Sequence, residues 1–267
     1  AVFASILLAS LHQFSFGSCF IVNPMAFWLW LSLYAFVALN IIIWRFTLPI
    51  VNFFRFQFTV DRIVQETPTT TSVYISARNV ERLHAVAGQF VLVRFFSRRF
   101  VLEEHPFSLS MIPHGDMIRL TIRHVGDFTE RIASLQPGTR VLVSGPFGRF
   151  THNVAQTDKR LFIAGGVGIT PIRSMAEEAV RDKRDAILLF GNKDRRDVPL
   201  RTELEKLHTR GLDLRYVYSD EKVASEEYCR IAGDLIERLV PDFHTRDIYL
   251  FGLSTMMEAI VADCEKR

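Results

Sequence analysis

The chain has 267 residues, enough for more than one hydrophobic core. Its net charge of +3 is the balance of 32 basic and 29 acidic residues, which argues against a nucleic-acid-binding protein. Cys19, Cys229 and Cys264 are too far apart for a C-x-x-C ligand pair, so we expect neither a zinc ribbon nor a ferredoxin-type iron–sulfur cluster within this chain.

Charge is unevenly distributed along the chain. Residues 1–44 contain no Asp, Glu, Lys or Arg, and within them Met25–Trp44 is a run of 20 mostly apolar residues with tryptophans near both ends. A helix of this length spans about 30 Å, the thickness of the hydrocarbon core of a bilayer. Arg45, Arg55 and Arg62 follow the run, whereas the loop before it is uncharged. The sequence therefore predicts a membrane-spanning helix with the rest of the chain in the cytoplasm.

A preceding helix is expected over Val2–Phe16, joined to this one by a short outer loop. Because the chain starts without a methionine or a basic segment, we interpret it as a fragment that begins inside a hydrophobic helix. His12 is the one histidine in the two helices. It is either a hydrogen-bonded packing residue or, since imidazole is a common axial ligand, a ligand of haem iron.

Residues 58–150 show short apolar–polar alternations separated by turn signals such as Pro113-His114-Gly115 and Pro137-Gly138. Short strands at this spacing indicate a small antiparallel barrel or sandwich, interrupted by one helix over Thr129–Leu135. The expected strands are Phe58–Val64, Thr71–Ala77, Gln89–Phe95, Met117–Arg123 and Arg140–Ser144.

From Lys159 onward, short apolar runs alternate with helical patterns. This alternation predicts a parallel sheet covered on both faces, with ligands at the carboxyl ends of its strands. The expected strands are Leu161–Ala164, Ala186–Gly191, Leu214–Ser219 and Asp247–Phe251, and the expected helices begin near Pro171, Pro199, Gly233 and Ser254.

The first of these strands runs into a glycine-rich stretch, L-F-I-A-G-G-V-G-I-T-P at Leu161–Pro171. We expect Thr170 to be the N-cap of the following helix and Pro171 its first residue. A strand, a glycine turn and a free helix N-terminus can bind a diphosphate through backbone N–H groups and the helix dipole. The stretch departs from G-x-G-x-x-G because Pro171 stands at the third glycine, and glycine turns also occur where nothing binds.

Two stretches in the barrel region carry further chemistry. H-P-F-S at His105–Ser108 offers an aromatic face and a hydroxyl at a strand edge, although an ordinary strand end could look the same. V-G-D-F-T at Val125–Thr129 offers a second glycine turn and helix N-terminus for phosphate.

The order of five motifs carries a resemblance. These motifs are G-Q-F at Gly88–Phe90, H-P-F-S at His105–Ser108, V-G-D-F-T at Val125–Thr129, G-P-F-G at Gly145–Gly148 and G-G-V-G-I-T-P at Gly165–Pro171. Together they resemble the ferredoxin-reductase-like flavoprotein superfamily and, within it, the ferric reductase and NADPH oxidase family of membrane electron carriers. The resemblance implies a multidomain chain with the last two helices of a truncated haem-binding transmembrane bundle (1–53), an antiparallel β-barrel FAD domain (54–152) and an α/β parallel-sheet NAD(P) domain (153–267).

The resemblance also implies residue roles. Phe107 would lie against the isoalloxazine ring, Ser108 near its N5 atom and Gly252 at the nicotinamide, and these three are the catalytic candidates. His105 and Pro106 would also line the flavin, and His12 would bind haem b together with residues that precede Ala1. The FAD diphosphate would be held by Arg123, Gly126, Asp127, Phe128 and Thr129, and the NAD(P)H diphosphate by Gly165, Gly166, Val167, Gly168, Ile169, Thr170 and Pro171.

The chain departs from the family pattern in two places. Phe251-Gly252-Leu253 stands where the family usually has Cys-Gly-Pro, which leaves the geometry of hydride transfer open. The chain also stops at Arg267, before the family's final strand and terminal aromatic residue, so we expect this chain alone to bind its cofactors poorly.

The choice of nucleotide depends on the loop after the second parallel strand. Lys193 and Arg195 lie where the adenosine ribose usually binds, and a cation there can pair with the 2′-phosphate of NADPH. Alternatively, Asp194 in the same loop favours NADH, or the loop is simply solvated.

These features predict a multi-pass membrane oxidoreductase with FAD and NAD(P) domains in the cytoplasm and no nucleic-acid partner. It would pass electrons from NAD(P)H through FAD and haem to ferric iron or oxygen on the outer side. A membrane-anchored flavin reductase without haem, which supplies a separate oxygenase or cytochrome, is the first alternative. A non-catalytic membrane scaffold is the second.

Overall fold

The structure is a computed structural model that describes residues 5, 9, 12, 23–98, 100, 103–223 and 226–266. It divides into two compact units, Ala1–Val51 and Asn52–Arg267. Of the expected helix Val2–Phe16, only Ser5, Ala9 and His12 are described; all three are helical and exposed. The rest of that helix lies outside the described residues.

An apolar helix is present where the membrane-spanning helix was predicted, and it extends beyond Trp44. α3 (Pro24–Ile41), a π-helical segment (Ile42–Thr47) and α4 (Leu48–Phe56) form one continuous helix of 33 residues. Asn23 begins it, because its side-chain oxygen accepts hydrogen bonds from the N–H groups of Met25 and Ala26 at 3.0 and 3.2 Å. Among the described residues this is the one helix that is long and apolar enough to cross a membrane. The described residues therefore do not show the transmembrane bundle that the resemblance implies.

The π-helical segment has a covalent cause. Pro49 has no N–H group to donate to the carbonyl of Arg45, four residues earlier. The N–H of Leu48 donates to the carbonyl of Ile43, five residues earlier, in the π pattern. This local widening lets the helix continue past a proline.

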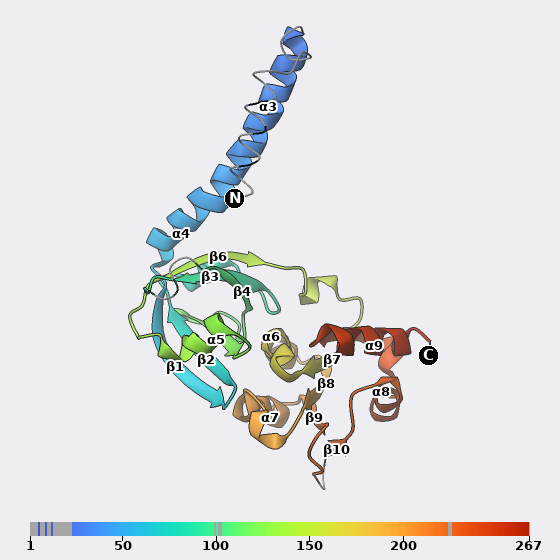
Figure 1. The fold of residues 1–267 in the computed structure, drawn as a ribbon. Coiled ribbons are helices and arrows are strands. Elements are labelled where there is room, and N and C mark those ends of the chain that lie inside the picture. Colours follow the sequence, from blue (N-terminus) through green and yellow to red (C-terminus); the bar gives the residue numbers. More distant parts are fainter. Residues whose placement is uncertain are drawn as a thin grey trace. The chain divides into compact units, whose positions relative to one another are not determined.

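Six strands form the barrel of the second unit (Figure 1). They make two three-stranded antiparallel sheets, ordered β1-β2-β5 and β4-β3-β6. Bridges between Thr59 and Arg140 and between Leu109 and Leu120 join the two sheets at both edges, so the strands close on themselves. Branched and aromatic side chains fill the interior, where Val73 is fully buried. The bounds are β1 (Thr59–Thr67), β2 (Thr70–Ser76), β3 (Phe90–Phe95), β4 (His105–Ser108), β5 (Met117–Arg123) and β6 (Val141–Phe147).

One short helix interrupts the barrel strands, as predicted. α5 (Asp127–Arg131) begins two residues before the expected start and continues as a 3₁₀ turn over Ile132–Ser134. Its Phe128 and the following Ile132 are buried in the barrel core, which fixes the helix against the barrel.

The C-terminal half is a five-stranded parallel sheet in the order β10-β9-β8-β7-β11. α6 and α7 cover one face and α8 and α9 the other, through two separate apolar clusters. Four strands were predicted; the two-residue β10 was not, because it is too short to show a hydrophobic period. The bounds are β7 (Lys159–Gly165), α6 (Ile169–Arg181), β8 (Asp185–Asn192), α7 (Arg201–Thr209), β9 (Asp213–Tyr218), β10 (Glu227–Tyr228), α8 (Gly233–Leu239), β11 (Asp247–Phe251) and α9 (Ser254–Cys264).

The helix after the glycine turn begins earlier than predicted. Gly168 is its N-cap and Ile169 its first residue, so the assignment of Thr170 as N-cap was wrong. Pro171 is tolerated in the first turn because the first four N–H groups of a helix have no intrahelical acceptor. With glycine at the N-cap, no side chain caps these N–H groups.

Candidate functional site

The glycine loop lies at the carboxyl edge of the sheet, between β7 and α6. A Cβ atom on Gly168 would lie 2.2 Å from the carbonyl oxygen of Phe251, and one on Gly165 would lie 2.5 Å from Sδ of Met256. Packing against the backbone of β11 therefore requires glycine at position 168 whether or not a ligand binds, whereas at Gly165 the flexible side chain of Met256 would have to move. The same packing holds the uncapped N-terminus of the 13-residue α6 at the sheet edge, where it can bind an anion.

Arg123, at the end of β5, lies against this loop. One of its guanidinium nitrogens is 3.0 Å from the position that a Cβ atom would take on Gly166, whose φ is +53°. The structure therefore brings together a barrel residue predicted to hold the FAD diphosphate and the loop predicted to hold the NAD(P)H diphosphate. The guanidinium and the helix N-terminus together form a positive region suited to phosphate.

Asp197 orients Arg123 and was missed by the sequence reasoning. Its carboxylate accepts hydrogen bonds from the hydroxyls of Thr67 and Thr69, both at 2.6 Å, and from Nη2 of Arg123 at 3.2 Å. Partial burial opposes ionisation, but the two hydroxyls and the charges of Arg123 and Lys193 outweigh it and hold the pKa of Asp197 below its ordinary value. An acidic residue at the end of a basic loop was the available signal, but Thr67 and Thr69 lie about 130 residues away in sequence and Arg123 lies 74 residues away.

The predicted flavin residues gather beside α5. The rings of Phe107 and Phe128 are stacked with centroids 6.2 Å apart, and the ring of His105 lies 3.9 Å from that of Phe128. Pro106 is exposed and Ser108 is half-buried on the same strand. β4 thus presents a half-buried aromatic surface at the barrel edge, against which the planar isoalloxazine ring of a flavin could pack.

The predicted phosphate turn Gly126–Thr129 is built by one side chain. The hydroxyl of Thr129 accepts hydrogen bonds from the N–H groups of Val125 and Gly126 at 2.9 and 3.1 Å, and donates to the carbonyl of Gly126. A Cβ atom on Gly126 would meet nothing within 4 Å, so the turn is open to solvent. The N–H groups of Asp127 and Phe128, in the first turn of α5, have no intrahelical acceptor and can face a phosphate.

The loop after β8 carries the predicted cations. Lys193 and Arg195 are both exposed, and the backbone N–H of Arg195 donates to Glu221 at 2.8 Å. The carboxylate of Asp194 accepts hydrogen bonds from two backbone N–H groups of its own loop, at 2.8 and 3.2 Å. Asp194 therefore stabilises the turn with one oxygen, and the cations remain exposed.

A buried amide completes this edge of the sheet. Asn192, the last residue of β8, is 8% exposed, and neither its side-chain nitrogen nor its oxygen has a hydrogen-bond partner among the described residues. An unpartnered buried amide costs free energy unless a ligand or water satisfies it. Together with the uncapped α6 and Arg123, it fits a dinucleotide bound across the carboxyl edge.

Phe251 and Gly252, at the end of β11, lie beside the glycine loop. Gly252 packs against Gly165, and a Cβ atom on it would lie 3.4 Å from the Cα of Gly165. Phe251, where the resemblance leads us to expect a cysteine, packs on Phe150 from the end of the barrel domain, with centroids 5.6 Å apart. Phe251 therefore forms an aromatic contact between the barrel and sheet domains beside the predicted nicotinamide position.

A second ion-pair group joins the barrel to the sheet domain. The guanidinium of Arg119 on β5 is 2% exposed and binds the carboxylate of Glu203 on α7, one contact being 3.0 Å. Arg173 on α6 binds the same carboxylate at 2.8 Å. Charged contacts from both Arg119 and Arg123 on β5 thus connect the barrel to the sheet domain.

The remaining predicted residue, His12, is described only as an exposed helical position, and its haem-binding role remains a prediction. Within the described residues, no group of three or more His, Cys, Asp or Glu side chains is arranged to hold a metal ion.

Comparison with known proteins agrees with this architecture. Residues 61–151 match the model of an FAD-binding domain, and residues 162–262 match the model of an oxidoreductase NAD-binding domain. A Candida albicans flavohemoprotein is 32% identical over 145 residues, covering 51% of this chain and 36% of that protein. Rat NADPH oxidase 1 is 35% identical over 92 residues, covering 33% of this chain and 16% of that protein.

Solved structures share the fold. An Amycolatopsis cytochrome P450 reductase superposes with a TM-score of 0.68 and 21% identity, covering 79% of this chain and 65% of that chain. The chain spans 36–50% of the length of the first curated relatives that it matches. The chain is therefore an oxidoreductase that carries an FAD-binding domain and an NAD-binding domain in the ferredoxin-reductase-like fold.

Proposed function

We propose that the chain is the cytoplasmic part and last membrane helix of a transmembrane oxidoreductase. It takes electrons from cytosolic NAD(P)H through FAD and haem b to ferric iron or oxygen across the membrane. The observation that carries this proposal is the continuity of the chain: only Gln57 and Phe58 separate the apolar helix Pro24–Phe56 from the first strand of the FAD barrel. The similarity to rat NADPH oxidase 1 supports the same assignment.

The residues of this chain bind and orient the reactants. FAD, when bound, accepts a hydride from NAD(P)H and releases electrons singly. Arg123 and the first turn of α5 hold its diphosphate, and Phe107 supports its ring. The uncapped N-terminus of α6 holds the diphosphate of NAD(P)H, and Gly252 leaves room for the nicotinamide.

Lys193 and Arg195 favour NADPH over NADH in this proposal. Both side chains are exposed in the loop after β8, where a 2′-phosphate would lie. A phosphate gains charge-assisted hydrogen bonds there that the 2′-hydroxyl of NADH cannot make.

His12 is the haem-binding residue that this chain contributes. It is helical, and its imidazole would bind the haem iron.

A membrane-anchored flavin reductase without haem is the second candidate. Two observations favour it: one possible span is found among the described residues, and a glycine betaine monooxygenase reductase subunit is 27% identical over 214 residues. Such a protein would deliver electrons to a separate oxygenase or cytochrome.

An absorbance spectrum of the full-length protein in detergent separates these functions. The protein is supplied with FAD and recorded before and after anaerobic addition of NADPH and, separately, NADH. Bleaching of the flavin with sharpening of haem bands is expected, and faster with NADPH. Bleaching without haem bands favours the second candidate, and no change with either nucleotide contradicts both. Superoxide formed without ferric chelate indicates an oxidase, and strict dependence on iron indicates a reductase.

A further inference from the structure

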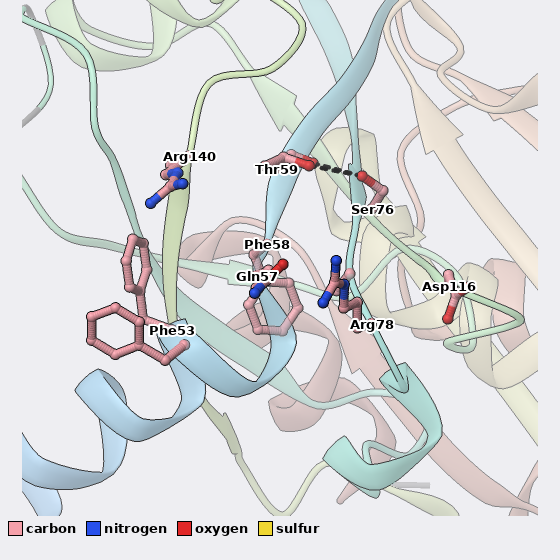
Figure 2. A pocket seen from close by; sticks show the side chains of 10 residues that line it. Phe53, Gln57, Phe58, Thr59, Ser76, Arg78, Asp116 and Arg140 are labelled. Carbon is pink, nitrogen blue, oxygen red and sulfur yellow. Dashed lines mark hydrogen bonds between the residues drawn. The ribbon is translucent and has the colours of Figure 1, made fainter.

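A cavity lies where α4 runs into β1. Its volume is about 540 Å³, and none of the residues predicted to bind FAD or nucleotide lines it. Phe53 and Phe54 line it from α4, Thr59 from β1, and Arg78 and Arg140 from the loops that follow β2 and precede β6 (Figure 2).

The cavity carries uncompensated positive charge. In the part of the chain that the structure describes, neither Arg78 nor Arg140 forms an ion pair. Asp116 is the one carboxylate in the lining, and it forms no ion pair with either arginine. The guanidinium of Arg140 lies 5.9 Å from the ring centroid of Phe53, a cation–π contact that holds it at the cavity wall.

Hydrogen-bond donors and a rigid wall complete the cavity. The hydroxyls of Thr59 and Ser76 are 2.9 Å apart and hydrogen-bonded, as Figure 2 shows. The N–H of Arg78 donates to the carbonyl of Phe56 at 2.7 Å, which ties the loop that bears Arg78 to the end of α4. Because these hydroxyls bond to each other, the donors left for a ligand are the two guanidinium groups, which can pair with phosphodiester oxygens.

The aromatic side adjoins an apolar surface. Phe54 is 68% exposed, and its ring meets that of Phe53 edge to face at 5.4 Å. Both residues belong to the last turns of the apolar helix Pro24–Phe56. Arginines beside exposed aromatic rings at the end of a membrane helix are placed at headgroup depth, where anionic lipids concentrate.

We propose that this cavity binds the headgroup of an anionic glycerophospholipid, whose phosphodiester pairs with Arg78 and Arg140 and whose acyl chains contact Phe54. This inference rests on the proposed membrane position of the apolar helix Pro24–Phe56.

The test measures binding of short-chain lipids to the full chain in detergent, without cofactors, by native mass spectrometry. Dioctanoyl phosphatidylglycerol is expected to bind at least tenfold more tightly than dioctanoyl phosphatidylcholine. Glycerol phosphate should compete weakly, because it lacks the acyl chains that contact Phe54. Equal binding of the two lipids by the wild-type chain would overturn the proposal, and full competition by glycerol phosphate would assign the cavity to a free phosphate ester instead.

Variants locate the effect. Arg78→Gln and Arg140→Gln should each raise the dissociation constant for phosphatidylglycerol at least tenfold. Arg82→Gln, an exposed arginine outside the cavity, should change it less than twofold. Equal losses in all three variants, or none in the first two, would contradict the assignment. Circular dichroism checks that each variant folds, and Arg78→Lys, which keeps the charge, serves where Arg78→Gln does not fold.

The outcome is separable from the proposed electron transfer. Lipid preference without flavin reduction or haem bands would leave the cavity assigned and refute the proposed function. Normal redox spectra with no lipid preference would support the proposed function and refute the lipid assignment of the cavity.

Discussion

Replacement of Glu203 by Gln removes the charge that compensates a buried arginine. Arg119 is 2% exposed, so its guanidinium cannot turn to water when its partner is lost. Arg173 binds the same carboxylate, but it also pairs with Glu177 and keeps that partner in the variant. The variant therefore leaves the buried guanidinium of Arg119 against a neutral amide, across the contact between the barrel and the sheet domain.

The expected loss of stability follows from burial. Removal of one partner of a buried ion pair costs about 3–5 kcal/mol, and since Glu203 is 29% exposed the lower value, about 3 kcal/mol, applies. For a domain of this size each kcal/mol lowers Tm by about 2–4 °C, so a decrease of about 6–12 °C is expected. Glu205→Gln is the matched control, because Glu205 lies on the same helix and its pair with Arg201 is exposed. It should change Tm by less than about 2 °C.

The effect also depends on pH. Partial burial opposes ionisation of Glu203, but the hydrogen bond and charge of Arg119 outweigh it and lower the pKa of Glu203 from 4.5. A lowered carboxyl pKa stabilises the fold above pH 4.5, and this stabilisation is lost as pH falls through the native pKa. The difference in stability between wild type and variant should therefore be largest near pH 7 and become smaller below pH 4.5.

Thermal unfolding of the full chain in detergent, followed by circular dichroism at pH 7 and at pH 4, measures both effects. A decrease in Tm for Glu203→Gln no larger than that for Glu205→Gln would refute the reasoning. So would a difference that grows toward acid pH.

Three further predictions concern the site. Gly168→Ala places a methyl group against a β11 carbonyl, so it should cost about 1–3 kcal/mol of stability and raise the KM for NADPH, which thermal unfolding and steady-state kinetics measure; an unchanged Tm would contradict the packing argument. Asp197→Asn keeps an acceptor for the two threonines but loses the charge facing Arg123, so titration should show FAD binding weakened about two- to fivefold, corresponding to about 0.5–1 kcal/mol; no change would mean that Arg123 needs no orienting partner. Replacement of both Lys193 and Arg195 by Ala should raise the KM for NADPH about tenfold and that for NADH much less, and equal effects would refute a 2′-phosphate site.

Local patterns predicted most of the fold, because strands and helices reflect the periodicity of the segment itself. β5 (Met117–Arg123) and β11 (Asp247–Phe251) were predicted with their observed bounds. Gly211 follows α7 with a φ of +116°, a conformation that favours glycine after a helix C-cap. The start of α6 was misplaced because a threonine followed by proline looks like a cap, whereas packing of Gly168 against Phe251 decides where the helix begins.

The predicted binding residues come from loops whose composition is itself the signal: glycines after a strand, an aromatic residue and a hydroxyl at a strand end. The residues that orient them carry no such signal. About 130 residues of sequence separate Thr67 and Thr69 from Asp197, and 84 residues separate Arg119 from Glu203. Nothing in the sequence around these residues indicates which partner each will contact.

The sequence by itself determined the three parts of this protein, an apolar helix, a barrel and a parallel sheet with a glycine turn, because each depends on the hydrophobic period of a continuous segment. Only the tertiary structure decided that Arg123 lies against Gly166, that Glu203 compensates Arg119, and that Arg78 and Arg140 line one cavity. Those contacts arise from closure of the barrel and packing of the sheet domain on it, which bring together side chains that no local pattern relates.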